Sequence, residues 1–88
     1  MDFSIAKGLE DTKLKIYPNP AQKEIRIALP ENETKLSVLI YDSKGLEILK
    51  TELFEKVNLV NTSELNRGIY FLKAQGERRL YQEKLILR

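Results

Sequence analysis

Asn58–Lys73 reads Asn-Leu-Val-Asn-Thr-Ser-Glu-Leu-Asn-Arg-Gly-Ile-Tyr-Phe-Leu-Lys, and we expect the other segments of the chain to pack around it. Within it, Ile69–Leu72 is a run of four bulky β-forming residues. A strand with one solvated face would alternate apolar and polar residues, so this run predicts a strand buried on both faces in the middle of a sheet. The preceding turn is Leu65–Gly68, where Gly68 can adopt a positive φ without steric cost.

The residues before that turn predict how the chain reaches the central strand. Asn61–Glu64 resembles one turn of helix, with Asn61 as the N-cap and Glu64 three residues later. Leu65 follows as an apolar side chain that can fill the core. We therefore expect a crossover that places Leu65 in the core, turns at Gly68 and enters the strand.

Length and composition indicate one small domain with a thin core, because the chain has 88 residues. The 15 basic and 13 acidic residues are dispersed and leave a net charge of only +2, which argues against a nucleic-acid or anionic-membrane partner. No apolar run approaches the roughly 20 residues that span a bilayer. Cysteine is absent, which fits a reducing compartment and equally an exported domain that needs no disulfide.

The first thirteen residues are polar and mixed, with Phe3, Ile5 and Leu9 as large apolar side chains. They predict a linker from a preceding protein or an N-terminal tail, and the alternative is an edge strand that uses Phe3 and Ile5. The start, Met1-Asp2-Phe3, carries an acid and lacks the long apolar core of a signal peptide, so for an exported domain we expect that signal to lie upstream in a larger protein. The domain itself is expected to cover residues 14–88.

Seven short strands are predicted, separated by turn signals. Asp42-Ser43-Lys44-Gly45 is a hairpin turn in which Asp42 and Ser43 bond the local backbone and Gly45 takes the left-handed position, and Gln75–Glu77 is another. These signals recur about every 8 to 12 residues without a long helix, so the fold class is all-β: a sandwich of two antiparallel sheets. In addition to Ile69–Leu72, the predicted strands are Leu14–Tyr17, Glu24–Leu29, Leu36–Tyr41, Leu46–Leu53, Val57–Val60 and Arg78–Arg88.

Three of these segments carry further information. Glu24–Leu29 alternates and so has one wet face, whereas Leu36–Tyr41 is apolar on both faces and predicts a second central strand. The first strand runs into Tyr17-Pro18-Asn19-Pro20, where the prolines stop regular pairing and make a stiff corner. The ring of Tyr17 either covers the end of the sandwich or forms part of a recognition surface.

The residue inventory argues against chemistry. Histidine and cysteine are absent, which excludes imidazole or thiolate metal sites and Ser-His-Asp or Cys-His catalysis. The glycines are too far apart for a phosphate loop, and the carboxylates show no acid–base spacing. We therefore expect no catalytic residue, metal, cofactor or small-molecule substrate. Asn32 and Asn61 match the short N-glycosylation pattern, but Asn61 is better explained as a cap.

The C-terminal end is basic. Four cations lie in the last eleven residues against Glu83 alone, and two interpretations are open. The cations either protect an edge strand from pairing with other chains, or they belong to an extended segment that a receptor grips by strand addition or by the terminal carboxylate. We expect the last strand to lie at a sheet edge with its basic side chains accessible: Arg78, Arg79, Lys84 and Arg88.

Four motifs now occur in order, namely Tyr17-Pro18-Asn19-Pro20, Ile40-Tyr41-Asp42-Ser43-Lys44-Gly45, Leu65-Asn66-Arg67-Gly68-Ile69-Tyr70-Phe71 and Lys84-Leu85-Ile86-Leu87-Arg88. In this order the chain resembles the type A C-terminal sorting domain of the type IX secretion system of certain Gram-negative bacteria. The resemblance covers roughly Leu14–Arg88. One mild departure is Arg88, where the family commonly has lysine.

The resemblance implies an immunoglobulin-like sandwich of about seven strands, without catalysis, at the end of a larger secreted passenger. Such domains are read in the periplasm, carried through an outer-membrane translocon and passed to a shuttle protein. A sortase-like peptidase then removes them, here before Leu14, with Ser4, Ala6 and Gly8 as candidate positions. The passenger ends at the outer membrane or cell surface, or is released.

Carried over to this sequence, the resemblance implies two sets of residues. The first forms the recognition signal: Gly68, Tyr70, Lys84, Leu85, Ile86, Leu87 and Arg88. The second shapes the fold: Tyr17, Pro18, Asn19, Pro20, Asp42 and Gly45.

Two other functions remain as alternatives. One is a carbohydrate-binding or adhesion sandwich appended to a secreted enzyme, which would need exposed aromatic residues on a flat platform, whereas the chain has no tryptophan. The other is a structural spacer.

Overall fold

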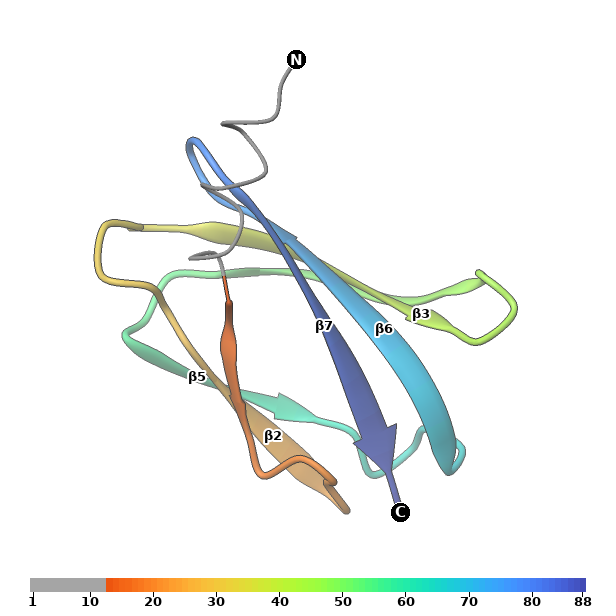
Figure 1. Cartoon of the computed structure of the whole chain (residues 1–88). Helices are drawn as coiled ribbons and strands as arrows, with labels where there is room; N and C mark the ends of the chain where they lie inside the picture. Colours follow the sequence, from red (N-terminus) through yellow and green to blue (C-terminus); the bar gives the residue numbers. More distant parts are fainter. Residues whose placement is uncertain (1–12) are drawn as a thin grey trace.

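The structure, a computed structural model, describes residues 13–88, which form seven strands and no helix (Figure 1). Within that range no helix is long and apolar enough to cross a membrane. The predicted all-β class is confirmed, and the strand bounds differ from the predicted ones by up to three residues. The strands are β1 (Lys15–Tyr17), β2 (Glu24–Ala28), β3 (Leu36–Asp42), β4 (Glu47–Leu53), β5 (Val57–Asn61), β6 (Gly68–Gln75) and β7 (Leu80–Leu87).

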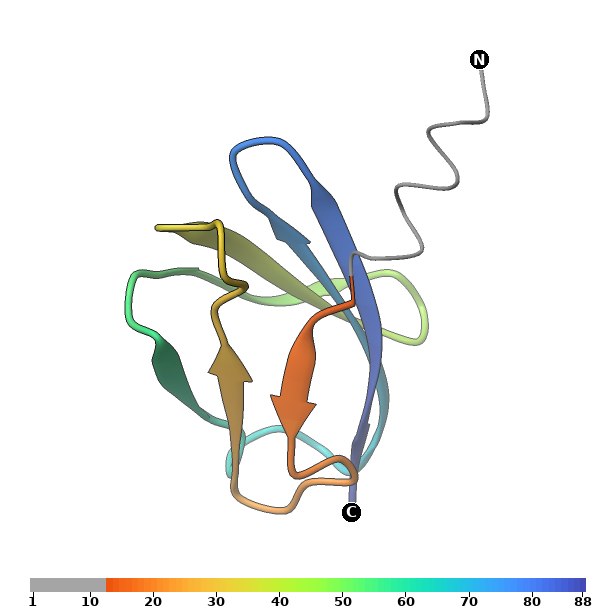
Figure 2. The same cartoon turned by 60° about the vertical axis from the view of Figure 1, so that its left-hand side comes forward.

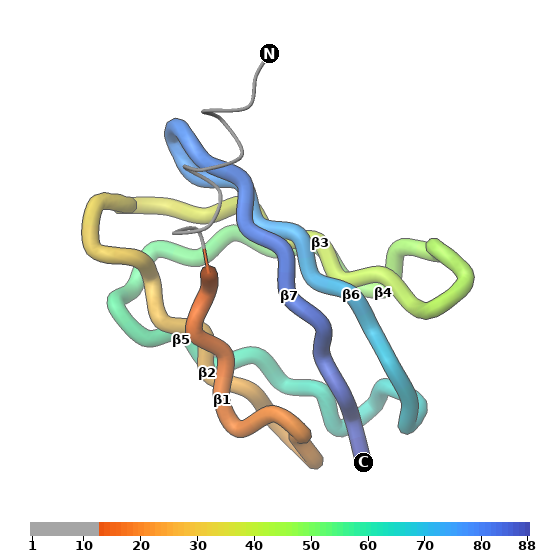
Figure 3. Tube along the Cα trace, viewed as in Figure 1, coloured from red at the N-terminus to blue at the C-terminus, as the bar shows by residue number. Residues whose placement is uncertain are grey.

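The strands form two antiparallel sheets, with the order β1-β2-β5 in one and β4-β3-β6-β7 in the other. Figures 2 and 3 show these sheets as two layers with the chain passing between them. In an immunoglobulin-like sandwich the third, sixth and seventh strands share one sheet, and the first, second and fifth share the other. The observed order follows that rule, with β4 added to the sheet of β3, and it confirms the predicted sandwich.

Alternation along the strands builds the core between the sheets. Ile25 and Ile27 of β2 point inward from the smaller sheet, and Leu36, Val38 and Ile40 of β3 point inward from the larger one; all five are fully buried. Full burial of an aliphatic side chain contributes about 1.5–3 kcal/mol. The wet face predicted for the second strand is confirmed, because Arg26 is exposed.

The prediction that Ile69–Leu72 is buried on both faces was wrong. Its place in the middle of a sheet is right, since β6 lies between β3 and β7. However, Tyr70 and Leu72 are buried while Ile69 and Phe71 are 44% and 45% exposed. The reason is that a sandwich has only two layers, so even a central strand has one outer face. Likewise β3, predicted apolar on both faces, has Leu39 and Tyr41 only half-buried on its outer side.

The structure also corrects the predicted helical turn at Asn61–Glu64, where it has a strand end followed by a tight turn. Asn61 is the last residue of β5, and the next residues form a turn closed by Leu65 N–H and the Thr62 carbonyl, 3.1 Å apart. Thr62 N–H donates to the Lys23 carbonyl at 2.8 Å, which holds the segment against β2 and leaves no length for a helix. Asn61 does cap the turn, because its Oδ1 accepts from Ser63 N–H at 2.8 Å. Leu65 is half-buried and packs against the core as predicted.

Two turns have the predicted backbone geometry. In the β3–β4 hairpin, Gly45 has a φ of +87°, and the Asp42 carboxylate accepts from the N–H groups of Lys44 and Leu46, both at 2.9 Å. At the start of β6, Gly68 has a φ of +148°. Just after it, the hydroxyl of buried Tyr70 donates to the Asn66 carbonyl at 2.6 Å. This bond is the tyrosine corner of immunoglobulin-like sandwiches, and it anchors the crossover.

We predict that Gly68→Ala lowers the free energy of unfolding by about 1–3 kcal/mol, because an L-residue is strained at this φ. The test isolates the backbone term, since a Cβ on Gly68 would have nothing within 4 Å. Urea unfolding measures the effect. The control is Glu64→Ala in the same crossover, for which we expect a change within about 0.5 kcal/mol. Equal effects of the two substitutions would contradict the strain.

Candidate functional site: the terminal strand and its corner

The terminal strand β7 lies at the edge of the four-stranded sheet, as predicted. On one side it pairs with β6 over its full length, from Gly68↔Leu87 to Gln75↔Leu80. This ladder also brings the predicted signal residues together, since Gly68 lies opposite Leu87 and Tyr70 lies opposite Leu85. The seven residues therefore share one end of the β6–β7 pair.

The other side of β7 is closed by the proline-rich corner. The Asn19 side chain donates from Nδ2 to the Lys84 carbonyl at 2.8 Å, and its Oδ1 accepts from Ile86 N–H at 3.0 Å. Ala21 continues this contact through its backbone: its N–H donates to the Ile86 carbonyl, and its carbonyl accepts from Arg88 N–H, both at 2.8 Å. Figure 2 shows the corner lying against the C-terminal end of β7.

Asparagine suits this position because one side chain carries both a donor and an acceptor, as a peptide group does. Pro18 and Pro20 flank it and have no N–H of their own, so the corner cannot extend as a regular strand. The four bonds, which we call the corner clamp, occupy the outer backbone groups from Lys84 to Arg88, at the end of β7 and just after it. Strand addition to this segment requires the corner to detach first.

The terminal side chains divide between two faces. Leu85 and Leu87 point into the core and are 0% and 2% exposed. The predicted accessibility of the basic side chains is confirmed, because Arg78, Arg79, Lys84 and Arg88 are all exposed. In the terminal segment the outward side chains are Lys84, Arg88 and the half-buried Ile86. The clamp leaves these three outward side chains as the part of the segment that a partner can contact.

The remaining predicted residues lie at two other places. Tyr17 ends β1 and is half-buried, with the Lys15 ammonium 5.6 Å from its ring centroid. Asp42 is the last residue of β3 and lies opposite Tyr70 of β6. Gly45 follows it in the β3–β4 hairpin, and neither residue is paired with the terminal strand. These residues shape turns and strand ends.

Several stabilising residues were missed by sequence reasoning. Asn58 is buried and closes the β4–β5 turn, since its Oδ1 accepts from Glu55 N–H at 3.0 Å and its Nδ2 donates to the Glu55 carbonyl at 2.7 Å. Ala21 is fully buried under the clamp. An asparagine between two prolines was a visible signal for the corner, but its partners are 65 and 67 residues away and no local pattern names them.

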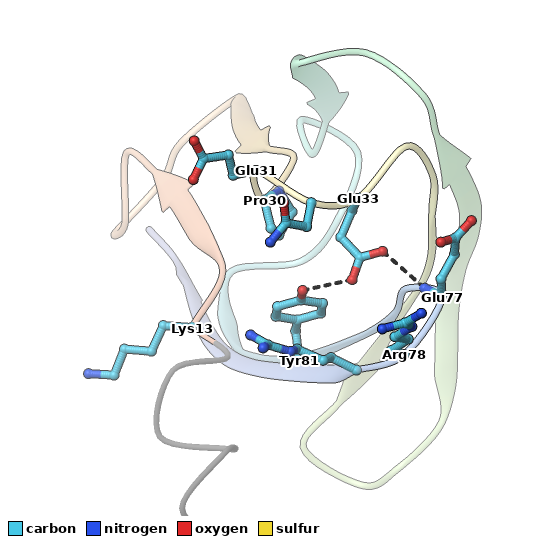
Figure 4. Close-up of a pocket in the computed structure, with 9 residues that line it drawn as sticks. Lys13, Pro30, Glu31, Glu33, Glu77, Arg78 and Tyr81 are labelled. Carbon is cyan, nitrogen blue, oxygen red and sulfur yellow. Dashed lines mark hydrogen bonds between the residues drawn. The ribbon is translucent and has the colours of Figure 1, made fainter.

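A polar cavity of about 530 Å³ lies between the β2–β3 loop and the β6–β7 hairpin (Figure 4). The Glu33 carboxylate reaches across it and accepts from Glu77 N–H and from the Tyr81 hydroxyl, both at 2.9 Å. A methyl group at Gly76 would overlap that carboxylate, so a larger residue there would displace the Glu33 side chain. Within residues 13–88 no cluster of three or more potential metal ligands exists. The two hydrogen bonds of Glu33 thus join the β2–β3 loop to the β6–β7 hairpin. The residues that line the cavity form neither an acid–base pair nor a metal site.

Burial, together with the hydrogen bond to Glu33 and the negative charge of that carboxylate, raises the pKa of Tyr81 to about 12. The folded state therefore holds the phenol proton more tightly than the unfolded state, whose pKa is about 10. This contribution to stability is fully present below pH 10 and is lost as the pH rises through about 12.

We predict that Asn19→Ala lowers the free energy of unfolding by about 1–2 kcal/mol, because two hydrogen bonds are lost at a solvent-exposed site. Amide hydrogen exchange of Ile86 should accelerate, since its N–H loses its acceptor. The matched control is Asn32→Ala, an exposed loop asparagine, with stability and Ile86 exchange unchanged. Unaltered Ile86 protection in Asn19→Ala would show that the clamp is not formed in solution.

We predict that a spectrophotometric titration shows a late tyrosine ionisation near pH 12, which belongs to Tyr81. Tyr81→Phe should remove this late step. Glu33→Gln should shift it to lower pH, because the charge that opposes phenolate formation is gone while an acceptor oxygen remains. Glu31→Gln, two residues away in the same loop, is the control that leaves the step in place. A late step that persists in Tyr81→Phe refutes the assignment.

The sequence comparisons agree with this architecture. The family described as the secretion system C-terminal sorting domain matches residues 15–88, which is every strand of both sheets together with the clamp. Beta-agarase A of Zobellia galactanivorans is 29% identical over 77 residues, which covers 82% of this chain. The match takes in only 14% of the agarase, so this chain spans a small part of that relative's length. The chain belongs to the family of C-terminal sorting domains of the type IX secretion system.

Proposed function

We propose that this domain directs a preceding passenger protein through the type IX secretion system and across the outer membrane. Membership of the sorting-domain family implies export to the cell surface or secretion of a fused protein. We propose four steps: recognition of the domain in the periplasm, passage through the translocon, transfer to the shuttle protein and removal of the domain from the passenger. The observation that carries it is the family match over all seven strands.

The fold suits a transported signal. Residues 13–88 pack a continuous apolar core, and the chain has no cysteine for a disulfide. The clamp and the β6 ladder hold the terminal strand on both sides. A signal held in this way presents the same surface on any passenger, because its shape depends on contacts within the domain. We infer that it has no catalytic role of its own.

We further propose that the sortase-like peptidase cuts on the N-terminal side of Leu14. Leu14 is buried, and its N–H donates to the Glu83 carboxylate at 2.9 Å, so Leu14 is already fixed within the sandwich. A peptidase needs an accessible, unpaired stretch of chain, whereas the residues directly after Leu14 are paired with β2. The earlier candidates Ser4, Ala6 and Gly8 lie outside the described residues, in the segment that we propose links the passenger to the domain.

Within the signal we propose two roles. Lys84, Ile86 and Arg88 face outward and contact the receptor. The other four predicted residues hold that segment in place: Gly68 and Tyr70 by the corner before β6, and Leu85 and Leu87 by burial in the core. Beta-agarase A carries a matching segment, which supports a secreted enzyme as the passenger here.

An export assay tests the function. We predict that a periplasmic reporter fused ahead of residues 1–88 reaches the surface or medium of a host with a type IX system. The reporter should stay in the periplasm when the translocon is absent or when Lys84–Arg88 is deleted. The deletion also removes buried Leu85 and Leu87, so a second variant, Lys84→Ala with Arg88→Ala, keeps the core intact. Periplasmic retention of the wild-type fusion would refute the proposal.

The carbohydrate-binding alternative draws support from one observation, the exposure of Phe71 beside Tyr41 on an outer face. The same fusion tests it. Retention on an agarose or cellulose column that is abolished by Phe71→Ser, without export, would favour that alternative.

A further inference from the structure

The outer face of the four-stranded sheet carries a contiguous apolar and aromatic patch. In the ladders, Phe71 lies between Tyr41 on β3 and Lys84 on β7, and Ile69 lies opposite Ile86. These five residues, which we call the outer patch, face away from the core. Ile69 and Phe71, both on β6, remain 44% and 45% exposed. Contiguous apolar surface of this kind marks interaction sites in proteins.

The patch has a basic margin on the β6–β7 side. Outward-facing residues alternate with buried ones, and on these two strands the outward charges are Lys73 and Lys84, without a carboxylate. Lys73 Nζ lies 5.7 Å from the ring centroid of Tyr41, so its charge is held over the patch. Glu83, the acid of β7, is turned aside to accept Leu14 N–H. Glu47 on β4 lies opposite Tyr41 and limits the basic margin on that side.

The patch also has a shallow hollow of about 270 Å³ between β6 and β7. Phe71 and Lys73 form one wall, and Gln82 and Lys84 form the other. An apolar side chain of a partner can therefore enter beside the Phe71 ring while carboxylates next to it pair with the two lysines. Aromatic anchors in the centre of an interface, with charges at its rim, are the usual arrangement of protein contacts.

The corner clamp determines whether a partner can bind β7 by its outer face or by its backbone edge. Because Asn19 and Ala21 occupy the backbone edge of β7 from Lys84 to Arg88, a partner that meets the folded domain cannot read that segment by strand pairing. Such a partner can contact the side chains of Lys84 and Ile86, which belong to the outer patch. The surface that remains accessible on the terminal segment is thus continuous with Phe71 and Ile69.

The opposite outer face provides a comparison. On the three-stranded sheet Leu59 is 61% exposed, but its cross-strand neighbour Arg26 lies 3.7 Å from the Glu24 carboxylate, so that cation already has a partner. The terminal strand has no residue on that face. That face offers matched substitutions of similar chemistry at a site where we expect no docking.

We propose that the outer patch is the docking surface for the export machinery, and that the partner presents an apolar centre bordered by aspartate or glutamate. This inference rests on the proposed function, and it names the face and the partner's chemistry. Charge complementarity supports this occupant, because a basic margin on the β6–β7 side of an aromatic centre attracts an acidic surface and repels a basic one.

Two patch variants test the proposal, Phe71→Ser and Lys84→Glu, each with its control on the other sheet, Leu59→Ser and Lys15→Glu. The first readout is export of the reporter fusion. The second is binding of the purified 88-residue chain to detergent-solubilised outer membrane from the host. Circular dichroism and thermal unfolding confirm that each variant is folded. We expect each patch variant to lose about tenfold in export and binding, each control to stay within about twofold, and wild-type binding to weaken as salt rises.

The outcomes separate this inference from the proposed function. Export of wild type and of both folded patch variants alike would overturn the docking surface and leave the sorting function standing. Absence of wild-type export, with membrane binding that still depends on Phe71 and Lys84, would overturn the function and support the surface. Absence of both export and binding would overturn both. Sedimentation of the chain alone gives a further check, because a dimer that Phe71→Ser dissociates would assign the patch to a second copy and refute the proposed partner.

Discussion

The Asn19 side chain bonds the last strand as a peptide group of a neighbouring strand would. The position and the accessible surface of the terminal segment depend on that contact. Its donor and acceptor reach Lys84 and Ile86, and Ala21 extends the contact to Arg88. An uncovered strand edge would expose unpaired backbone groups to any extended chain nearby. Here the corner between β1 and β2 covers that edge and joins the two sheets on one side of the sandwich.

This constraint lets the terminal segment contribute to the core and still expose side chains to solvent, as the proposed recognition signal requires. Leu85 and Leu87 fill the core, the backbone is bonded on both sides, and only one face of side chains remains for a partner. The segment therefore cannot be separated energetically from the fold. Loss of its residues changes both the stability of the domain and the surface that carries Lys84, Ile86 and Phe71.

Two tyrosines stabilise opposite ends of the β6–β7 pair through hydrogen bonds of their hydroxyl groups. Tyr70 ties the start of β6 to the crossover through the Asn66 carbonyl, and Tyr81 ties the hairpin end to Glu33. Both rings are buried and both hydroxyls are bonded, which is the arrangement that a buried phenol requires. The family to which the chain belongs is a sorting domain, and these contacts give that signal a fixed shape.

Local features of the sequence alone determined the strands, the Asp42–Gly45 hairpin and the turn at Gly68, because alternation and turn chemistry act over a few residues. Only the tertiary structure decided that Ile69 and Phe71 face outward, since a continuous apolar run does not state how many layers will cover it. The same holds for Asn19 with Ile86 and Glu33 with Tyr81, pairs that are 67 and 48 residues apart. Their contacts depend on how the two sheets pack, which no local pattern encodes.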